Sequence, residues 1–195
     1  MRPAAAVLLA GAVVLFGTAC EEDYVPEENP STDASPSATA DADKPVDADL
    51  GRTLDLGTPT TVSYKRAGDR TGTLQLTADS VEKGAMSDLD EVRLDAEQRA
   101  KVPYYVTMTF RNVGEKTVAH PFTPTGLRDA RGEEADELVT VDDEVTECVN
   151  EGEYELSAGT EQTRCLVFLV AKGQRPSVVT YTADFDKEPV FWKAD

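Results

Sequence analysis

The chain has 195 residues and a mass of 21.1 kDa, and its 37 Asp and Glu against 19 Lys and Arg give a formal net charge of −18. This length suits one domain with appendages. The acid excess excludes nucleic acid as a partner, because phosphate-backbone binding needs a face rich in Lys and Arg. It also excludes attachment to an anionic membrane surface by charge alone. Three Cys are too few for a disulfide-dense scaffold, and one His leaves little for metal binding or general-base catalysis.

Residues 1–19 have the features of an export signal. Arg2 supplies a positive charge, an unbroken apolar run covers 4–16, and small residues precede Cys20. This run is shorter than the roughly 20 residues that span a bilayer, but it suits the apolar region of a signal peptide. A Cys after small residues resembles a bacterial lipobox, although Gly17 stands where an aliphatic residue is usual. We therefore predict a lipoprotein signal peptide over 1–19 and acylation of Cys20 with diacylglycerol and palmitate; the alternatives are an ordinary signal peptide or an uncleaved anchor.

An acidic segment follows the cysteine. Residues 21–50 contain ten acids, one Lys and four Pro around a middle rich in Ser, Thr and Ala. Such a sequence buries too little apolar surface to offset the entropy cost of ordering. It predicts a disordered tether over 20–50 that holds a domain, residues 51–195, away from the membrane.

The domain over 51–195 carries strand-like runs separated by turn residues, which predicts a mainly β fold. Polar and apolar side chains alternate over 104–113, as in a half-buried antiparallel strand. The run 165–171 is apolar on both faces and suits a central strand whose second face is covered. The expected strands are 60–65, 73–81, 104–113, 127–128, 138–141, 154–156, 165–171, 178–185 and 189–192.

One segment has a helical period instead. Ser87 with an acid three residues later resembles an N-cap, Leu89 and Val92 fall near one helical face, and Pro103 ends the pattern. We predict a short helix over about 88–100 that covers the outer side of the Cys165 strand. Short strands with turn signals and one helical insertion predict an antiparallel β-sandwich.

A combination of short motifs runs through residues 85–192. It consists of Ser87-Asp88-Leu89, Pro103-Tyr104-Tyr105-Val106, Arg111-Asn112-Val113-Gly114, Gly159 ahead of Cys165-Leu166-Val167-Phe168-Leu169-Val170, and Val190-Phe191-Trp192. Together they resemble a family of secreted lipoproteins of Gram-positive, high-G+C bacteria with an immunoglobulin-like (telokin-like) β-sandwich domain. The absence of Ile beside abundant Val agrees with a G+C-rich genome. The resemblance implies this fold and a place outside the cell, with no catalytic residues to carry over.

The cysteines that remain after Cys20 are Cys148 and Cys165, and an even pair in an exported domain predicts a disulfide. Closing this loop would stabilise the fold by about 3 kcal/mol on the chain-entropy model. A zinc site would need four ligands, and His120 is distant in sequence. A redox pair would be spaced more closely, as in CxxC.

Two features could carry chemistry. His120 could serve a Ser/His/Asp triad, but no Ser lies in a G-x-S-x-G turn, so we expect no catalytic residues. The window 133–161 holds twelve acids and neither Lys nor Arg, which suits a solvated face, a Ca²⁺ site or a surface for a basic partner. No D-x-D-x-D-G loop is present, and the weak metal candidates are Asp142, Asp143, Glu144 and Glu147.

The aromatic residues are expected mainly in the sandwich core. Tyr105 falls on the opposite face of its strand and is therefore the candidate contact residue. The aromatic residues expected in the core are Tyr104, Phe110, Phe168, Tyr181, Phe185, Phe191 and Trp192.

We expect a protein that is not an enzyme, is anchored to the cell membrane by lipid, and displays a β-sandwich binding module on the extracellular side. The expected partner is an envelope or extracellular protein, and no small-molecule cofactor is expected. The alternative is a structural or stress-related envelope protein without a specific ligand; a cation-binding protein or a hydrolase is less favoured.

Overall fold

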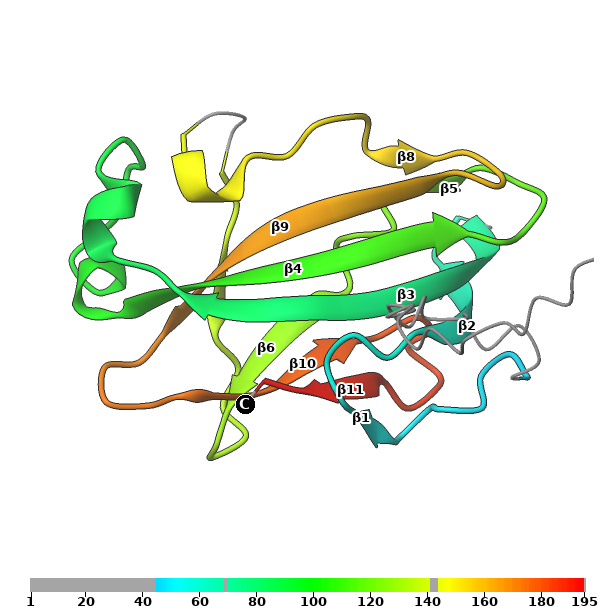
Figure 1. Ribbon diagram of the computed structural model, residues 1–195, viewed down its shortest axis with the longest axis horizontal. Coiled ribbons are helices and arrows are strands. Elements are labelled where there is room, and N and C mark those ends of the chain that lie inside the picture. The colour runs from blue at the N-terminus through cyan, green and yellow to red at the C-terminus, as the bar shows by residue number, and fades with distance from the viewer. Residues whose placement is uncertain (1–44, 69, 141–143, 195) are drawn as a thin grey trace, which may run out of the picture. The chain divides into compact units, whose positions relative to one another are not determined.

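Alternating apolar residues build two antiparallel layers that pack face to face (Figure 1). The computed structural model describes residues 45–68, 70–140 and 144–194. The predicted signal peptide, Cys20 and residues 21–44 of the expected tether lie outside the described residues. The predicted fold class, an immunoglobulin-like antiparallel β-sandwich with a short helical segment, is confirmed.

The two sheets take strands from both halves of the domain. One sheet has the order β1 (Thr53–Leu54), β11 (Val190–Lys193), β10 (Pro176–Tyr181) and β6 (Thr125–Asp129). The other has the order β2 (Thr60–Arg66), β3 (Arg70–Lys83), β4 (Val102–Asn112), β9 (Glu161–Val170) and β7 (Asp136–Leu138). A separate pair joins β5 (Val118–Ala119) to β8 (Glu155–Leu156). Strand pairing is antiparallel except between β1 and β11.

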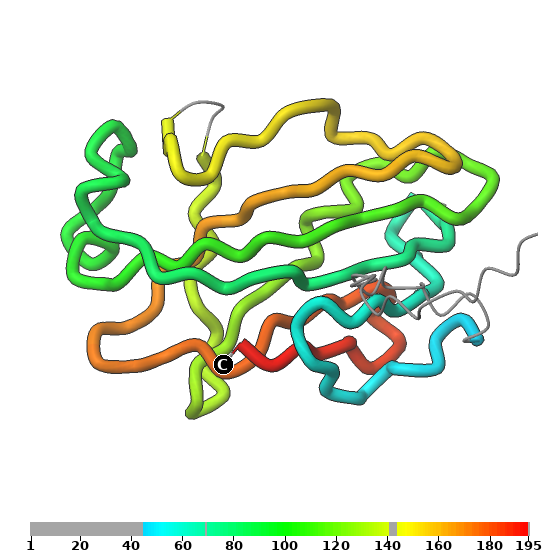
Figure 2. The backbone as a smooth tube through the Cα atoms, in the orientation of Figure 1, coloured from blue at the N-terminus to red at the C-terminus, as the bar shows by residue number. Residues whose placement is uncertain are grey.

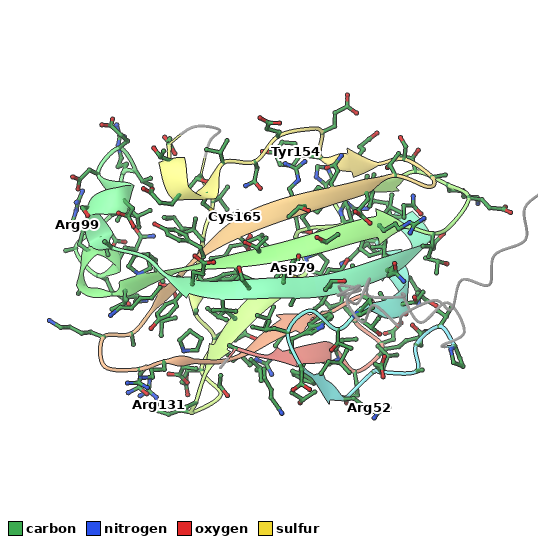
Figure 3. All side chains as sticks on the ribbon, viewed as in Figure 1. Arg52, Asp79, Arg99, Arg131, Tyr154 and Cys165 are labelled. Carbon is green, nitrogen blue, oxygen red and sulfur yellow. A yellow bond between two sulfur atoms is a disulfide. The ribbon has the colours of Figure 1, made fainter. Side chains whose placement is uncertain are left out.

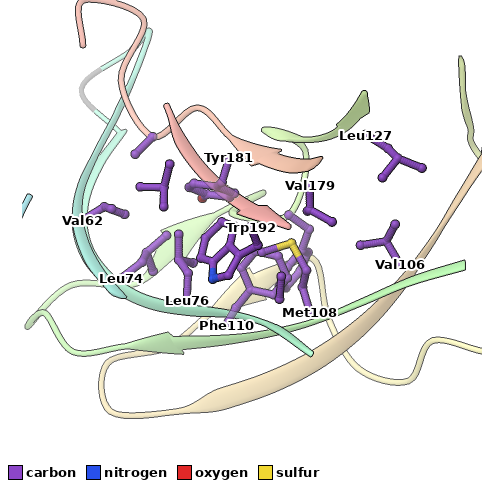
Figure 4. Close-up of a cluster of buried hydrophobic side chains, with 14 of the residues drawn as sticks. Val62, Leu74, Leu76, Val106, Met108, Phe110, Leu127, Val179, Tyr181 and Trp192 are labelled. Carbon is purple, nitrogen blue, oxygen red and sulfur yellow. The ribbon is translucent and has the colours of Figure 1, made fainter. Parts of the chain in front are cut away.

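The main core lies between the two sheets, as Figure 4 shows. The inward residues of β4, among them Val106 and Phe110, are fully buried, in line with the alternation of this strand. Trp192 on β11 is fully buried as well, and its indole Nε1 donates a hydrogen bond to the carbonyl of Thr58 at 2.9 Å. Phe110 packs edge-on against Phe122, with ring centroids 4.9 Å apart.

A second apolar cluster covers the outer face of the β4–β9 region. Leu89 and Leu94 from the segment after β3 pack there with Val167 and Leu169 of β9, so this segment covers the outer side of the Cys165 strand as expected. Tyr105 lies in this cluster with 7% of its surface exposed, and its hydroxyl donates to Asp88 at 3.0 Å. Burial, and next the hydrogen bond with Asp88, raise the pKa of Tyr105. The prediction of Tyr105 as an exposed contact residue is therefore wrong.

The helical segment consists of two 3-10 helices, η1 (Met86–Leu89) and η2 (Gln98–Ala100), with no continuous helix between them. A continuous helix would turn Leu94 away from Leu89, whereas the structure buries both side chains in the outer cluster. The carboxylate of Asp88, rather than the Ser87 side chain, accepts the amide of Ala85 at the start of η1, at 2.7 Å. No helix in the described part of the chain has the length and apolar character needed to cross a bilayer.

The packed part of the chain begins before residue 51. The amide of Asp47 donates to the carbonyl of Thr61 at 2.8 Å, and its carboxylate accepts the amide of Ser63 at 2.7 Å and the ammonium of Lys187 at 2.6 Å. Asp49 is buried and accepts the hydroxyl of Thr60 at 2.9 Å. Residues 45–50, which the acid content assigned to the tether, are thus packed on the domain because each of these two acids meets hydrogen-bond donors there.

Candidate functional site

A disulfide fixes the acidic segment that precedes β9. Cys148, at the end of η3 (Thr146–Cys148), is bonded to Cys165 of β9, with the two Cα atoms 5.2 Å apart. The side-chain amide of Asn150 then makes two bonds of 2.8 Å to the backbone amide and carbonyl of Cys165. Asn150 therefore occupies the edge of β9 where a neighbouring strand would pair. Figure 2 shows this segment, in yellow, running alongside β9, in orange.

A first hollow, which we name the disulfide hollow, lies between the end of β7 and this segment. Its volume is about 170 Å³. Figure 3 shows Tyr154 and Cys165 on this side of the molecule. The hollow is lined by His120, Phe122, Thr123, Glu137, Leu138, Val139, Thr140, Cys148, Asn150, Tyr154, Arg164, Cys165, Leu166 and Val167.

Arg164 brings a positive charge to the base of the disulfide hollow. Its side chain is buried, and the guanidinium carbon lies 4.5 Å from the ring centre of Phe122 and 5.8 Å from that of Tyr154. The guanidinium donates hydrogen bonds to the carbonyl of Glu153 and, at 2.8 Å, to the side chain of Gln162. Stacking and hydrogen bonding within the domain thus hold this cation in place.

His120 lines the disulfide hollow with a backbone φ of 51°. Its amide donates to the carbonyl of Tyr154 at 2.8 Å, and its own carbonyl accepts the hydroxyl of Thr123 at 3.2 Å. Neither Ser nor Asp is among the described residues that line this hollow. The lining residues in the described part of the chain therefore place no Ser/His/Asp triad around His120.

A second hollow, the threonine hollow, opens between β6 and β7 with a volume of about 340 Å³. Its outer end is formed by Phe185, which is 78% exposed and stacks on the Arg66 guanidinium at 4.4 Å. The prediction of Phe185 in the core is therefore wrong, because the chain turns after β10 and the inward places are taken by Ala183 and Asp184. The hollow is lined by Arg66, Thr123, Pro124, Thr125, Gly126, Leu127, Glu134, Ala135, Glu137, Phe168, Thr180, Thr182 and Phe185.

β6 and β7 belong to different sheets and meet near the turn between them, at an isolated antiparallel bridge of Arg128 with Glu134. Beside this bridge the amide of Ala135 donates to the carbonyl of Leu127 at 2.8 Å. Continuing the same register would place Thr125 opposite Glu137, but the threonine hollow opens there. By the same alternation the backbone groups of Glu137 face this gap.

Glu137 is common to both hollows. It lies opposite Phe168 on β9, so its side chain is on the inter-sheet face of β7. Its carboxylate has no hydrogen-bond or ion-pair partner among the described residues. The residue is exposed, and partial desolvation by the surrounding groups raises its pKa. The two hollows share Glu137 and Thr123 in their linings, and we name the two together the open-side groove.

Charged side chains of both signs line the open-side groove, the acids Glu134 and Glu137 and the arginines Arg66 and Arg164. Glu134 pairs with Arg128 at 2.9 Å. Within the described residues no three His, Cys, Asp or Glu side chains are close enough to hold a metal ion. Of the four calcium candidates, Asp142 and Asp143 lie outside the described residues, so that site stays a prediction.

The high acid content of the window 133–161 hides its groove residues in the sequence. Tyr154 is the one aromatic residue in this window, and Leu138-Val139 is an apolar pair between acids. Val139 is 87% exposed and Tyr154 58% exposed. Apolar side chains within an otherwise acidic segment were the sequence signal that could have indicated these groove residues.

No family model and no curated protein sequence matches the chain. Among solved structures, the yjhA protein of Bacillus subtilis is similar with a TM-score of 0.50 and 17% identity, over 73% of this chain and 99% of that one. The ycdA lipoprotein candidate of Bacillus subtilis has a TM-score of 0.46 and 17% identity over 63% of this chain, which spans 36% of that protein. An uncharacterised β-sandwich protein of Clostridium difficile has a TM-score of 0.44 and 11% identity, over 73% and 93% of the two chains. The similarity to yjhA supports the fold.

Proposed function

We propose that the protein is a lipoprotein of the Gram-positive type, anchored outside the cell through Cys20, whose β-sandwich binds a partner in the open-side groove and catalyses no reaction. The observation that carries the binding role is the position of its exposed apolar side chains. Val139 and Tyr154 border the disulfide hollow, and Phe185 borders the threonine hollow. Apolar side chains gathered around a concave surface favour a binding site, because water solvates them poorly.

The anchoring part rests on the apolar run, the small residues and Cys20. Two acyl chains hold a protein stably on a bilayer, since each buried CH₂ contributes about 0.8 kcal/mol. Replacing Cys20 with alanine should abolish labelling by an alkyne-tagged palmitate and release the protein from the membrane fraction. Ser31→Ala, in the adjoining tether, should keep both properties. A Cys20→Ala variant that stays membrane-bound at full length would contradict the lipid anchor.

The binding part can be tested by photocrosslinking on intact cells. A chain with p-benzoylphenylalanine in place of Tyr154 should give a discrete adduct, because this side chain borders the groove. The same amino acid in place of Val113, which is 45% exposed and lines neither hollow, should give none. Adding Val139→Lys should remove the adduct by placing a charge among the apolar side chains that border the groove. Equal adducts from both positions, or none from position 154, would contradict the binding role.

A further inference from the structure

We infer that the open-side groove takes an extended polypeptide segment in which a Lys or Arg, flanked by apolar residues, pairs with Glu137. This inference rests on the proposed function, since it names the ligand class of the same groove. The arrangement is a carboxylate between two hollows that are bordered by exposed apolar side chains.

The central carboxylate favours a cationic group. Glu137 belongs to both hollows, and its side chain lies on the same face as Phe168. A partly desolvated carboxylate without a partner is stabilised by a ligand that brings a positive charge and a hydrogen-bond donor. Neither arginine of the groove is directed to Glu137, since Arg164 donates to the carbonyl of Glu153 and the side chain of Gln162, and Arg66 donates to the carbonyls of Thr182 and Ala183.

The charge of the segments that flank the groove favours the same ligand and disfavours two others. The described stretches 133–140 and 144–155 contain nine acids and neither Lys nor Arg, and two of these acids, Glu134 and Glu137, line the groove itself. The chain's own residues 21–44 carry eight acids against one Lys, so they would be repelled from the groove. A second copy would bring the same acidic flanking stretches to the contact and meet the same repulsion. A basic segment of another protein is the complementary occupant.

The backbone around Glu137 favours an extended conformation. The backbone bonding between β6 and β7 ends at Leu127 and Ala135, and the threonine hollow opens where Thr125 would face Glu137. A segment lying in the groove can therefore use backbone groups of Glu137 in the way that added strands use a sheet edge. The disulfide hollow, at about 170 Å³, is below the size of typical small-molecule pockets and suits a side chain instead.

The competing explanation is protective. An inward-pointing charge on an edge strand also prevents edge-to-edge aggregation. Protection requires no ligand and no preference for one charge over another. Binding selectivity for a basic residue therefore separates the two explanations.

The experiment measures peptide binding by fluorescence anisotropy with the full chain in detergent. The probes are a labelled heptapeptide, Ser-Val-Leu-Lys-Leu-Val-Ser, and versions with Gln or Glu at the centre. The Lys peptide should bind about tenfold more tightly than the Gln peptide, and the Glu peptide more weakly than either. Glu137→Gln should remove the preference for Lys. The matched control Glu151→Gln removes one exposed acid of the same window that lines neither hollow, and it should keep the preference.

Several outcomes would overturn the inference. Equal binding of the Lys and Gln peptides would do so, and the proposed groove would still stand if Val139→Lys abolished binding of both. Equal loss of affinity in Glu137→Gln and Glu151→Gln would mean that the peptide is attracted to acids in general and not to Glu137. A dimer in sedimentation that Val139→Lys dissociates would assign the groove to a second copy. Absence of any peptide binding would also overturn it, whereas the photocrosslink from position 154 decides the proposed function separately.

Discussion

Replacing Trp192 with alanine should lower the free energy of unfolding by about 3–5 kcal/mol, the usual cost of removing a large aromatic side chain from a core. Trp192 is fully buried between the sheets, next to residues such as Met108 (Figure 4). The substitution also leaves the carbonyl of Thr58 without the indole donor. Both lost interactions are made by the Trp192 side chain of β11, the strand that lies between β1 and β10.

The measurement is urea unfolding followed by far-UV circular dichroism, because Trp192 is the single Trp of the chain and its fluorescence disappears with it. Phe191→Ala is the matched control, since the neighbouring side chain points to the other face of β11 and is half-buried. Phe191→Ala should lower the free energy of unfolding clearly less than Trp192→Ala does. An equal decrease for the two substitutions would contradict the placement of Trp192 at the centre of the core.

Removing the disulfide by Cys148→Ala together with Cys165→Ala should cost about 3 kcal/mol, since the bond closes a short loop in the unfolded chain. The loss should also reach the groove, because the disulfide positions the segment in which Asn150 bonds to the β9 edge. The variant should therefore bind the Lys-centred peptide more weakly even under conditions where it remains folded.

Differential scanning calorimetry with and without a reductant checks this prediction. The reductant should lower the melting temperature of the unaltered chain toward that of the double variant, and it should leave the double variant unchanged. Complete reduction can be verified by thiol labelling. If the melting temperature of the unaltered chain stayed the same after complete reduction, this would contradict a stabilising role for the bond.

The sheet strands were predictable where the sequence period matched one buried face. Alternation placed the observed β4, and apolar residues on both faces marked β9 as a strand covered on its outer side. Strands β1 and β5 were not predicted, because two residues are too few to show a period. Their positions depend on partners distant in the sequence.

The groove was much less predictable than the sheets. The exposure of Phe185 depends on a turn after β10, and the burial of Tyr105 depends on a cover supplied by residues after β3. The position of Glu137 between two hollows depends on where β6 and β7 separate to enter different sheets. A local sequence pattern cannot predict these three positions, since each depends on the packing of segments that are distant in the sequence.

The parallel pairing of β1 with β11 has a consequence for the order in which the domain forms. Thr53 and Leu54, near the start of the folded part, pair with Phe191 and Trp192 near its end. Wherever the chain folds, β1 cannot pair with β11 until the last strand is available, while β2, β3 and β4 can pair one after another along the chain. The five-stranded layer can therefore begin to assemble from neighbouring segments, whereas the four-stranded layer needs both ends of the folded part.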